Sequence, residues 1–223
     1  MTNSISASVP LAAHFQLCKD QSPKTDSEKA KMEKIPYSNA IGSVMYLMVS
    51  TRHDIAYAVS CLSRFMSNPG TIHWEALKWL FRYLNGSNNS GIKFSKCSEG
   101  VKLIGYVDSN YANDRDSRRS TTSYVFTLCG ACISWKSQLQ NIVDLSTTEA
   151  EYIAILKLLK KLFGAKLCKN PVFHDRTKHI DVRYHFIRDI VGNGLFSLGP
   201  RSSFGCDDNQ DPPPLDLVQG GDC

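Results

Sequence analysis

The sequence predicts an α+β protein in which a short helical unit precedes a mixed β-sheet with flanking helices. Three observations support this class. Apolar residues repeat with the helical period from about residue 35 to residue 85. Strand-type segments rich in Thr, Tyr, Val and Phe follow, from about residue 92 to residue 145. A second helical pattern, over residues 146–163, comes directly after them.

The composition is that of an intracellular globular protein. The chain has 223 residues and is 42% hydrophobic, enough for one ordinary domain plus additional segments. No apolar run approaches the roughly 18 residues of a membrane span, and residues 1–15 do not resemble a secretory signal. Eight Cys without framework spacing predict reduced thiols. We therefore expect a cytoplasmic or nuclear protein with no membrane partner and no small-molecule ligand.

The N-terminal half is predicted to be helical after a polar start. Residues 1–34 are turn-rich and charged, which indicates a linker or extension with little fixed structure. Residues 35–91 carry three helical patterns with short connections, which predicts a small antiparallel helical unit. Its Met and aromatic residues, Trp74 and Trp79 included, are interpreted as packing residues rather than as base-stacking platforms.

The C-terminal half is predicted to contain the sheet, over residues 92–191. Strands are expected at residues 92–94, 101–107, 120–129, 131–136 and 140–145, with a hairpin turn at Gly130. A helix follows to about Phe163, and a last helical piece covers residues 182–191. Residues 192–223 contain six Gly, four Pro and five Asp, a composition that predicts a disordered tail.

Glu151 is the residue of the 146–163 helix that most needs an explanation. Ser146 and Glu149 form a capping-box pattern, so Glu149 is placed at the start of the helix on its solvated side. At 100° per residue, Glu151 instead shares a face with Ile155, Leu158 and Leu162. A carboxylate on an apolar face is costly unless it is paired, hydrogen-bonded or bound to a metal.

Three acids on different elements suggest a metal site. Asp108 leaves the predicted strand at residues 101–107, Glu151 lies on the helix, and Asp181 lies in a later basic segment. Carboxylates that converge from different elements hold Mg²⁺, and two such ions can promote phosphodiester cleavage. The alternative is that Asp108 caps a turn, Glu151 bonds locally and Asp181 is a surface residue.

A basic segment follows the helix start. Between residues 157 and 188, six Lys and three Arg outnumber the acids, which suits a phosphate backbone. The alternative is a solvated basic face that has no partner. The candidate nucleic-acid-binding residues are Lys157, Lys160, Lys161, Arg176, Lys178 and Arg183.

Ordered runs along the chain resemble the C-terminal part of the Pol polyprotein of plant Copia-type retrotransposons. The runs include Ile-Pro-Tyr-Ser-Asn-Ala-Ile-Gly-Ser-Val-Met-Tyr (35–46), Thr-Arg-His-Asp-Ile-Ala (51–56), Leu-Ser-Arg-Phe-Met-Ser-Asn-Pro-Gly (62–70), Gly-Tyr-Val-Asp (105–108), Arg-Arg-Ser-Thr-Thr-Ser-Tyr-Val-Phe (118–126), Leu-Ser-Thr-Thr-Glu-Ala-Glu-Tyr (145–152) and Lys-His-Ile-Asp (178–181). The resemblance covers residues from about 9 to 191.

The resemblance implies the tail of a reverse transcriptase, a helical connection and an RNase H-like domain. That domain cuts the RNA strand of RNA–DNA hybrids with Mg²⁺ held by four acids. By motif, Asp108 matches the acid of the first strand, Glu151 the helix acid and Asp181 the last acid.

The chain also departs from the family pattern. The family has a further strand with a catalytic Asp between the Ala-Glu-Tyr motif and the Asn-Pro motif, whereas here no Asp occurs between Glu151 and Asp175. Asn110 replaces a usual Asp, His53 replaces a usual Pro, and Asp144 interrupts an apolar strand.

Two hypotheses follow. The first is a truncated RNase H-like fragment whose Mg²⁺ binding and hybrid cleavage are weakened or lost, with Asp108, Glu151 and Asp181 as its site. The second is a non-catalytic remnant that binds RNA–DNA hybrid or another nucleic acid through the basic segment, or that has no molecular role.

Overall fold

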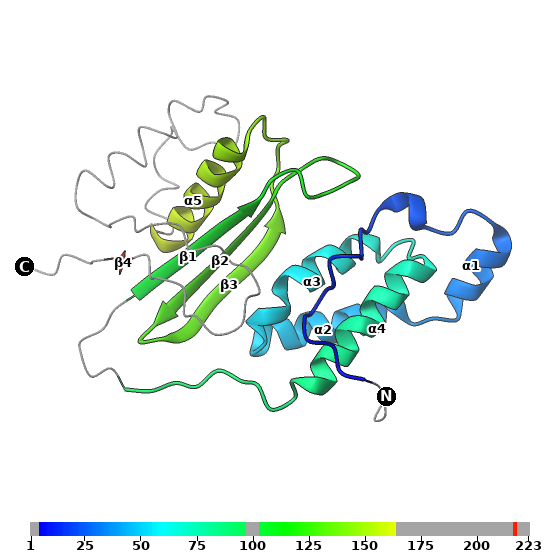
Figure 1. Ribbon diagram of the computed structural model, residues 1–223, viewed down its shortest axis with the longest axis horizontal. Helices are drawn as coiled ribbons and strands as arrows, with labels where there is room; N and C mark the ends of the chain where they lie inside the picture. The colour runs from blue at the N-terminus through cyan, green and yellow to red at the C-terminus, as the bar shows by residue number, and fades with distance from the viewer. Residues whose placement is uncertain (1–4, 97–102, 164–215, 218–223) are drawn as a thin grey trace, which may run out of the picture. The chain divides into compact units, whose positions relative to one another are not determined.

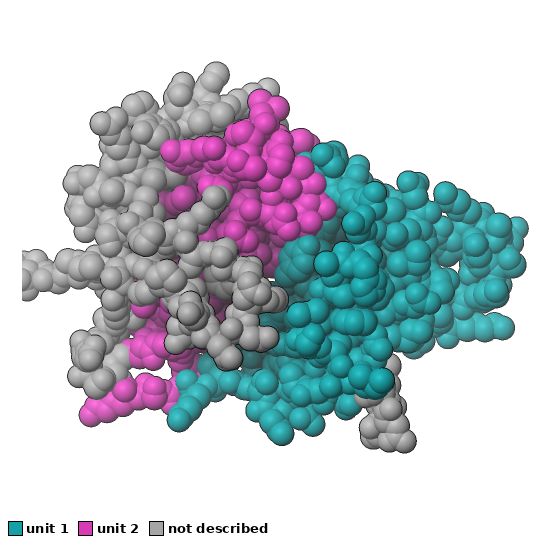
Figure 2. Space-filling view, viewed as in Figure 1, with its two compact units in different colours: residues 1–93, 114–118 teal, residues 94–113, 119–223 magenta. Residues whose placement is uncertain are grey.

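The computed structural model describes residues 5–96, 103–163 and 216–217 (Figure 1). The chain divides into two compact units (Figure 2). Unit 1 comprises residues 1–93 and 114–118, and unit 2 comprises residues 94–113 and 119–223. The described elements agree with the α+β class. In the described part, no helix combines the length and the apolar content that crossing a bilayer requires.

Unit 1 is built on three helices, as the helical periodicity predicts. They are α2 (Tyr37–Ser50), α3 (Ala56–Leu62) and α4 (Thr71–Gly86), and short 3₁₀ turns, η2 (His53–Ile55) and η3 (Ser63–Phe65), flank α3. Their apolar faces form one core. Its fully buried large residues include Ile41, Leu62, Leu77 and Leu80. The Tyr37 hydroxyl donates a hydrogen bond of 2.9 Å to the Leu62 carbonyl, which satisfies this buried polar group.

Within the N-terminal segment, residues 5–34 have defined structure, which corrects the expectation of little fixed structure there. It contains η1 (Lys19–Gln21) and α1 (Asp26–Glu33). Thr25 caps α1, because its hydroxyl accepts from the Glu28 amide and the Glu28 carboxylate accepts from the Thr25 amide. Leu11, Phe15 and Leu17 pack on the core of unit 1. The segment is ordered because a few spaced apolar side chains find a core to cover.

His73 and Gly70 hold this segment at the start of α4. The Gly70 amide donates 2.8 Å to Nδ1 of His73, and Nε2 of His73 lies 3.2 Å from the Cys18 carbonyl. The ring is fully buried and stacks on Phe65 at 3.9 Å. A Cβ atom at Gly70 would lie 1.9 Å from the Gln21 carbonyl oxygen, so this close approach requires glycine.

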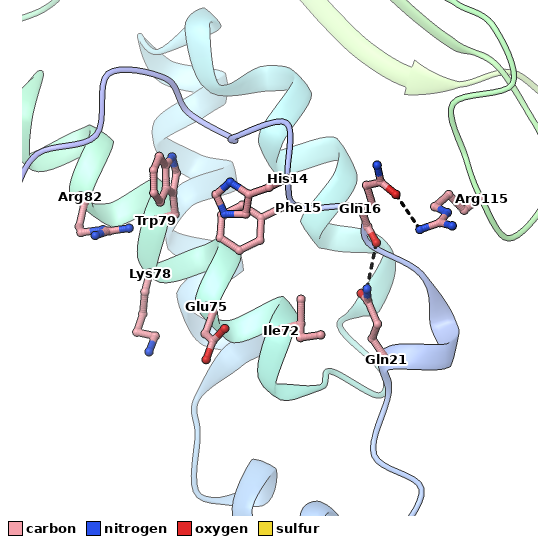
Figure 3. A pocket seen from close by; sticks show the side chains of 10 residues that line it. All are labelled: His14, Phe15, Gln16, Gln21, Ile72, Glu75, Lys78, Trp79, Arg82 and Arg115. Atoms are coloured by element: carbon pink, nitrogen blue, oxygen red, sulfur yellow. Dashed lines mark hydrogen bonds between the residues drawn. The ribbon is translucent and has the colours of Figure 1, made fainter.

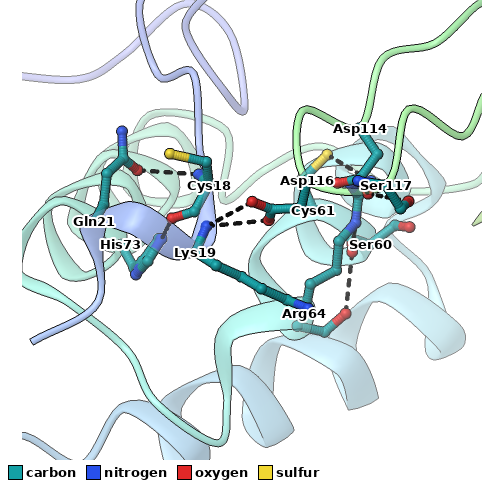
Figure 4. A network of polar contacts seen from close by, with 11 residues as sticks. Cys18, Lys19, Gln21, Ser60, Cys61, Arg64, His73, Asp114, Asp116 and Ser117 are labelled. Atoms are coloured by element: carbon teal, nitrogen blue, oxygen red, sulfur yellow. Dashed lines mark hydrogen bonds and ion pairs between the residues drawn. The ribbon is translucent and has the colours of Figure 1, made fainter.

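Two charged networks fix other parts of unit 1. Arg52 is buried, donates to both carboxylate oxygens of Asp54, and reaches Ser87 just after α4. Arg64 donates 2.9 Å to the buried Asp114 carboxylate, which also accepts from the Ser117 amide and hydroxyl (Figure 4). Charge-assisted bonds of this kind are stronger than neutral ones. The bond between Arg64 and Asp114 connects residues 114–118 to unit 1.

Unit 2 is an antiparallel sheet covered by one described helix. The strands β1 (Leu103–Asn110), β2 (Thr121–Leu128), β3 (Ala131–Leu139) and the two-residue β4 (Asp216–Leu217) pair in the order β3-β2-β1-β4. The β2–β3 hairpin turns at Cys129 and Gly130, with φ of 52° and 78°, and a two-residue type I′ turn requires positive φ at both of these positions. The helix α5 (Thr147–Phe163) packs on β1 and β2 (Figure 1).

Several predicted strand features differ from the structure. Residues 92–94 are not a strand, because they pair with no other strand among the described residues. Residues 140–145 are not a strand either, because the chain bends there before α5 begins. All described pairings are antiparallel, whereas a mixed sheet was expected. The first strand continues past residue 107 and contains Asp108. The predicted helical piece 182–191 and most of the tail lie outside the described residues.

The cysteines differ in state. Cys18, Cys61 and Cys132 are free thiols, whereas Cys129 is disulfide-bonded, so the reduced state expected for the eight Cys does not hold for Cys129. Since Cys132 is free, the Cys129–Cys132 pair is not a disulfide.

We expect His73 to make unit 1 sensitive to acid. Burial lowers the pKa of His73, against the opposing effects of the Cys18 carbonyl and Asp116. Below about pH 6.5, the ordinary pKa of histidine, His73 is protonated in the unfolded chain but stays neutral in the folded chain. The free energy of unfolding is therefore expected to fall as the pH drops below that value, and denaturant titrations at a series of pH values measure the slope.

His73→Gln should reduce this slope, because glutamine does not titrate. His53→Gln changes an exposed histidine of the same unit and should leave the slope as it is. Equal slopes for the two variants would show that His73 is not the group responsible.

Candidate functional site

Asp108 lies in the second half of β1, two residues before its end, and it is exposed. It pairs with Ser123 of β2, while the preceding residue, Val107, pairs with Tyr124 and packs against the core that α5 covers. Neighbouring residues of a strand point to opposite faces. The strand alternation therefore directs Asp108 to the face of the sheet opposite α5.

Glu151 and Glu149 have different environments within the first turns of α5. The Glu149 carboxylate accepts 2.8 Å from the Leu145 amide, and the Ser146 hydroxyl accepts 3.1 Å from the Glu149 amide. The sequence prediction of a cap at Ser146 is confirmed, and Glu149 is a capping residue. Glu151 is half-buried, on the side of the helix where Leu158 is buried, as its helical angle predicts.

The other predicted site residues fall into two groups. Asp181, Arg176, Lys178 and Arg183 lie outside the described residues. Lys160 and Lys161 are exposed on α5. Lys157 is half-buried and its ammonium lies 3.5 Å from the Leu139 carbonyl, so it is not a free surface cation.

The described residues hold two of the three predicted metal ligands, Asp108 and Glu151. No group of three or more His, Cys, Asp or Glu side chains suited to a metal ion occurs in the described part. Two carboxylates alone do not make the convergent oxygen set that Mg²⁺ requires. Convergence of Asp108, Glu151 and Asp181 stays a prediction.

Gln140 fixes the start of α5 on the sheet, a role that sequence reasoning missed. Its side chain is fully buried. Its Nε2 donates 2.9 Å to the Ala150 carbonyl and 3.0 Å to the Thr122 hydroxyl, and lies 3.5 Å from the Ser109 hydroxyl. The Gln140 amide also donates 2.8 Å to the Ser120 carbonyl. The only signal for this role in the sequence is a polar residue inside an expected apolar strand.

Asp144 and Lys157 form a second buried polar group near the start of α5. Asp144 is 3% exposed, and burial raises the pKa of its carboxyl against the opposing effects of Ser120 and Lys157. Burial lowers the pKa of Lys157 to about 8, and Asp144 opposes this shift. The departure noted at Asp144 thus corresponds to a buried acid whose charge opposes the lowering of the pKa of a partly buried lysine.

Comparison with known proteins gives the ancestry of the chain. It is 46% identical over 215 residues to the retrovirus-related Pol polyprotein from transposon TNT 1-94 of Nicotiana tabacum, a match that covers 86% of this chain. It is 42% identical over 187 residues to the Pol polyprotein from transposon RE1 of Arabidopsis thaliana. Its relatives thus include retrovirus-related Pol polyproteins of plant transposons, which supports a retrotransposon Pol fragment. The matches span 16% and 13% of these two polyproteins, so the Pol-related chain corresponds to a small part of each.

A third relative is covered by the match over most of its own length. Secreted RxLR effector protein 161 of Plasmopara viticola is 48% identical over 124 residues, which cover 56% of this Pol-related chain and 87% of that protein. No protein-family model matches the chain. No solved structure matches it either.

We expect Gln140→Ala to destabilise unit 2 by roughly 2–3 kcal/mol, because it leaves buried polar groups without partners and opens a cavity. Urea denaturation measures the loss, and hydrogen exchange of the β2 and α5 amides locates it. Asn141→Ala, a change at an exposed neighbouring amide, should stay within about 0.5 kcal/mol. Similar losses for both variants would contradict the role assigned to Gln140.

We expect Lys157 to make stability rise with pH in the alkaline range. The folded pKa of about 8 lies below the value of about 10.4 for an unfolded lysine. Between these values the unfolded chain holds more protons, so the free energy of unfolding increases with pH. Lys157→Met should remove this increase, whereas Lys161→Met, at an exposed position of the same helix, should retain it.

Proposed function

We propose that unit 2 derives from the RNase H-like domain of a Copia-type Pol polyprotein and that unit 1 derives from its reverse transcriptase tail and connection. The observation that carries the proposal is the order of elements and acids. Three antiparallel strands, with Asp108 in the first, lead directly into a helix that carries Glu151 and packs on that first strand. This is the arrangement that the resemblance implies for a hybrid-cleaving domain.

We further propose that this chain has lost Mg²⁺-dependent cleavage. The family's fourth acid has no counterpart, since no Asp occurs between Glu151 and Asp175. The carboxylates suit Mg²⁺ by type, but the set is incomplete, so no hydrolytic step is derived from it.

A second candidate function is binding of nucleic acid without cleavage. It is supported by the exposed cations Lys160 and Lys161 on α5. Lys157 is an unsuitable member of this set because it is half-buried beside Asp144. A labelled RNA–DNA hybrid is the relevant ligand, and binding through phosphate contacts must weaken with salt.

The full chain, incubated with Mg²⁺ and a labelled RNA–DNA hybrid, is expected to give no more cleavage than a chelator control. Hybrid binding is expected to weaken as salt increases and to fall by about twofold or more in a Lys160→Gln, Lys161→Gln double variant. Gel analysis of the labelled RNA and fluorescence anisotropy provide the two readouts.

The matched pair Glu151→Gln and Glu149→Gln identifies any residual activity. Glu149→Gln retains an acceptor for the cap and therefore serves as a control for helix integrity. Mg²⁺-dependent cleavage that Glu151→Gln abolishes and Glu149→Gln retains would overturn the proposed loss of catalysis.

A further inference from the structure

Unit 1 contains a pocket of about 720 Å³ between the N-terminal segment and α4 (Figure 3). All residues that line it belong to unit 1. On α4 they follow helical spacing, with Glu75, Trp79 and Arg82 on a different side of the helix from the buried Leu77 and Leu80. The volume is within the range of about 300–1,000 Å³ that is typical of ligand sites.

Three aromatic rings make one wall of the pocket. The His14 ring lies 4.2 Å from Phe15 and 5.5 Å from Trp79, and Phe15 lies 5.8 Å from Trp79. The Trp79 indole N–H donates 2.9 Å to the Val9 carbonyl, which fixes the orientation of the ring. His14 is the exposed member of the three, so its ring is accessible to a ligand.

Three cations also line the pocket. The Arg82 guanidinium lies 4.5 Å from the centre of the Trp79 ring, and Lys78 directly precedes Trp79 on α4. Arg115 donates a hydrogen bond of 2.9 Å to the Gln16 side chain. None of the three cations forms an ion pair with a carboxylate among the described residues. Glu75 is the one acid in the lining, so the pocket has an excess of positive charge.

We propose that this pocket binds a nucleotide, with the base against His14 and the phosphate near Lys78 and Arg82. A simple anion does not need an aromatic wall, and an apolar ligand does not need three cations without carboxylate partners. A nucleotide offers both a planar aromatic base and a negative phosphate. In this proposal Trp79 remains a packing residue, and it also supports the aromatic wall.

The nucleotide has two possible sources with the same chemistry, a free mononucleotide and an unpaired position in a single strand. A base inside a duplex is stacked between its neighbours and cannot reach the wall without being displaced. Single-stranded nucleic acid and free nucleotide should therefore bind, and a duplex should bind less well.

The test uses the full chain and three probes: labelled single-stranded oligo(dA), the same strand annealed to its complement, and adenosine monophosphate as competitor. We expect single strand to bind more tightly than duplex by fluorescence anisotropy. Displacement of the strand by adenosine monophosphate would show that the pocket also accepts the free nucleotide. Binding of the strand without displacement would assign the pocket to the strand alone.

Substitutions then locate the binding. His14→Ala is expected to weaken binding about tenfold, whereas His14→Phe, which keeps an aromatic ring, should stay within about twofold. Lys78→Gln should weaken binding several-fold, and Glu75→Gln should strengthen it, because the net positive charge of the pocket falls and rises respectively. Lys31→Gln removes a charge from α1, outside the pocket, and should have little effect.

The proposal is overturned if none of the probes binds, or if single strand binds equally well to wild type, His14→Ala and Lys78→Gln. Circular dichroism checks that each variant is folded. Single-strand binding that persists in the Lys160→Gln, Lys161→Gln double variant but falls in His14→Ala would separate this pocket from the nucleic-acid binding proposed for unit 2.

Discussion

The buried amide of Gln140 is the contact on which the arrangement of unit 2 depends. It sits where β3 ends and joins Thr122 of β2 to the Ala150 carbonyl in the first turns of α5. Because the buried amide nitrogen of Gln140 bonds both elements, this contact helps to set where α5 begins and which side of it meets the sheet. Glu151 follows Ala150 directly, so the same contact places the predicted catalytic acid at the border of the helix–sheet interface.

A close backbone approach has the same importance in unit 1. Gly70 admits the Gln21 carbonyl, and His73 ties the amide of Gly70 to the carbonyl of Cys18. The N-terminal segment is thereby held along α4. One consequence is the pocket lined by His14 and its aromatic neighbours. It exists because the N-terminal segment is fixed beside the solvent-facing side of α4.

Several motifs that relate the chain to the retrotransposon Pol family have structural roles here. Arg52 and Asp54 of the Thr-Arg-His-Asp run form a charged network, Gly70 of the Asn-Pro-Gly run allows close packing, and Ser146 caps α5. Shared motifs of this kind indicate a shared fold more directly than a shared reaction. The two proposals therefore rest on different chemistry, incomplete carboxylates in unit 2 and a basic aromatic pocket in unit 1.

The sequence by itself determined the α+β class, the three helices of unit 1, the β2–β3 hairpin and the cap of α5, because these follow from local periodicity, turn residues and capping patterns. It also separated Glu149 from Glu151 by helical geometry. Only the tertiary structure decided the order in the N-terminal segment, the role of Gln140 and the face on which Asp108 lies. These depend on contacts between residues far apart in the chain, such as His73 with Cys18, and local patterns carry no information about them.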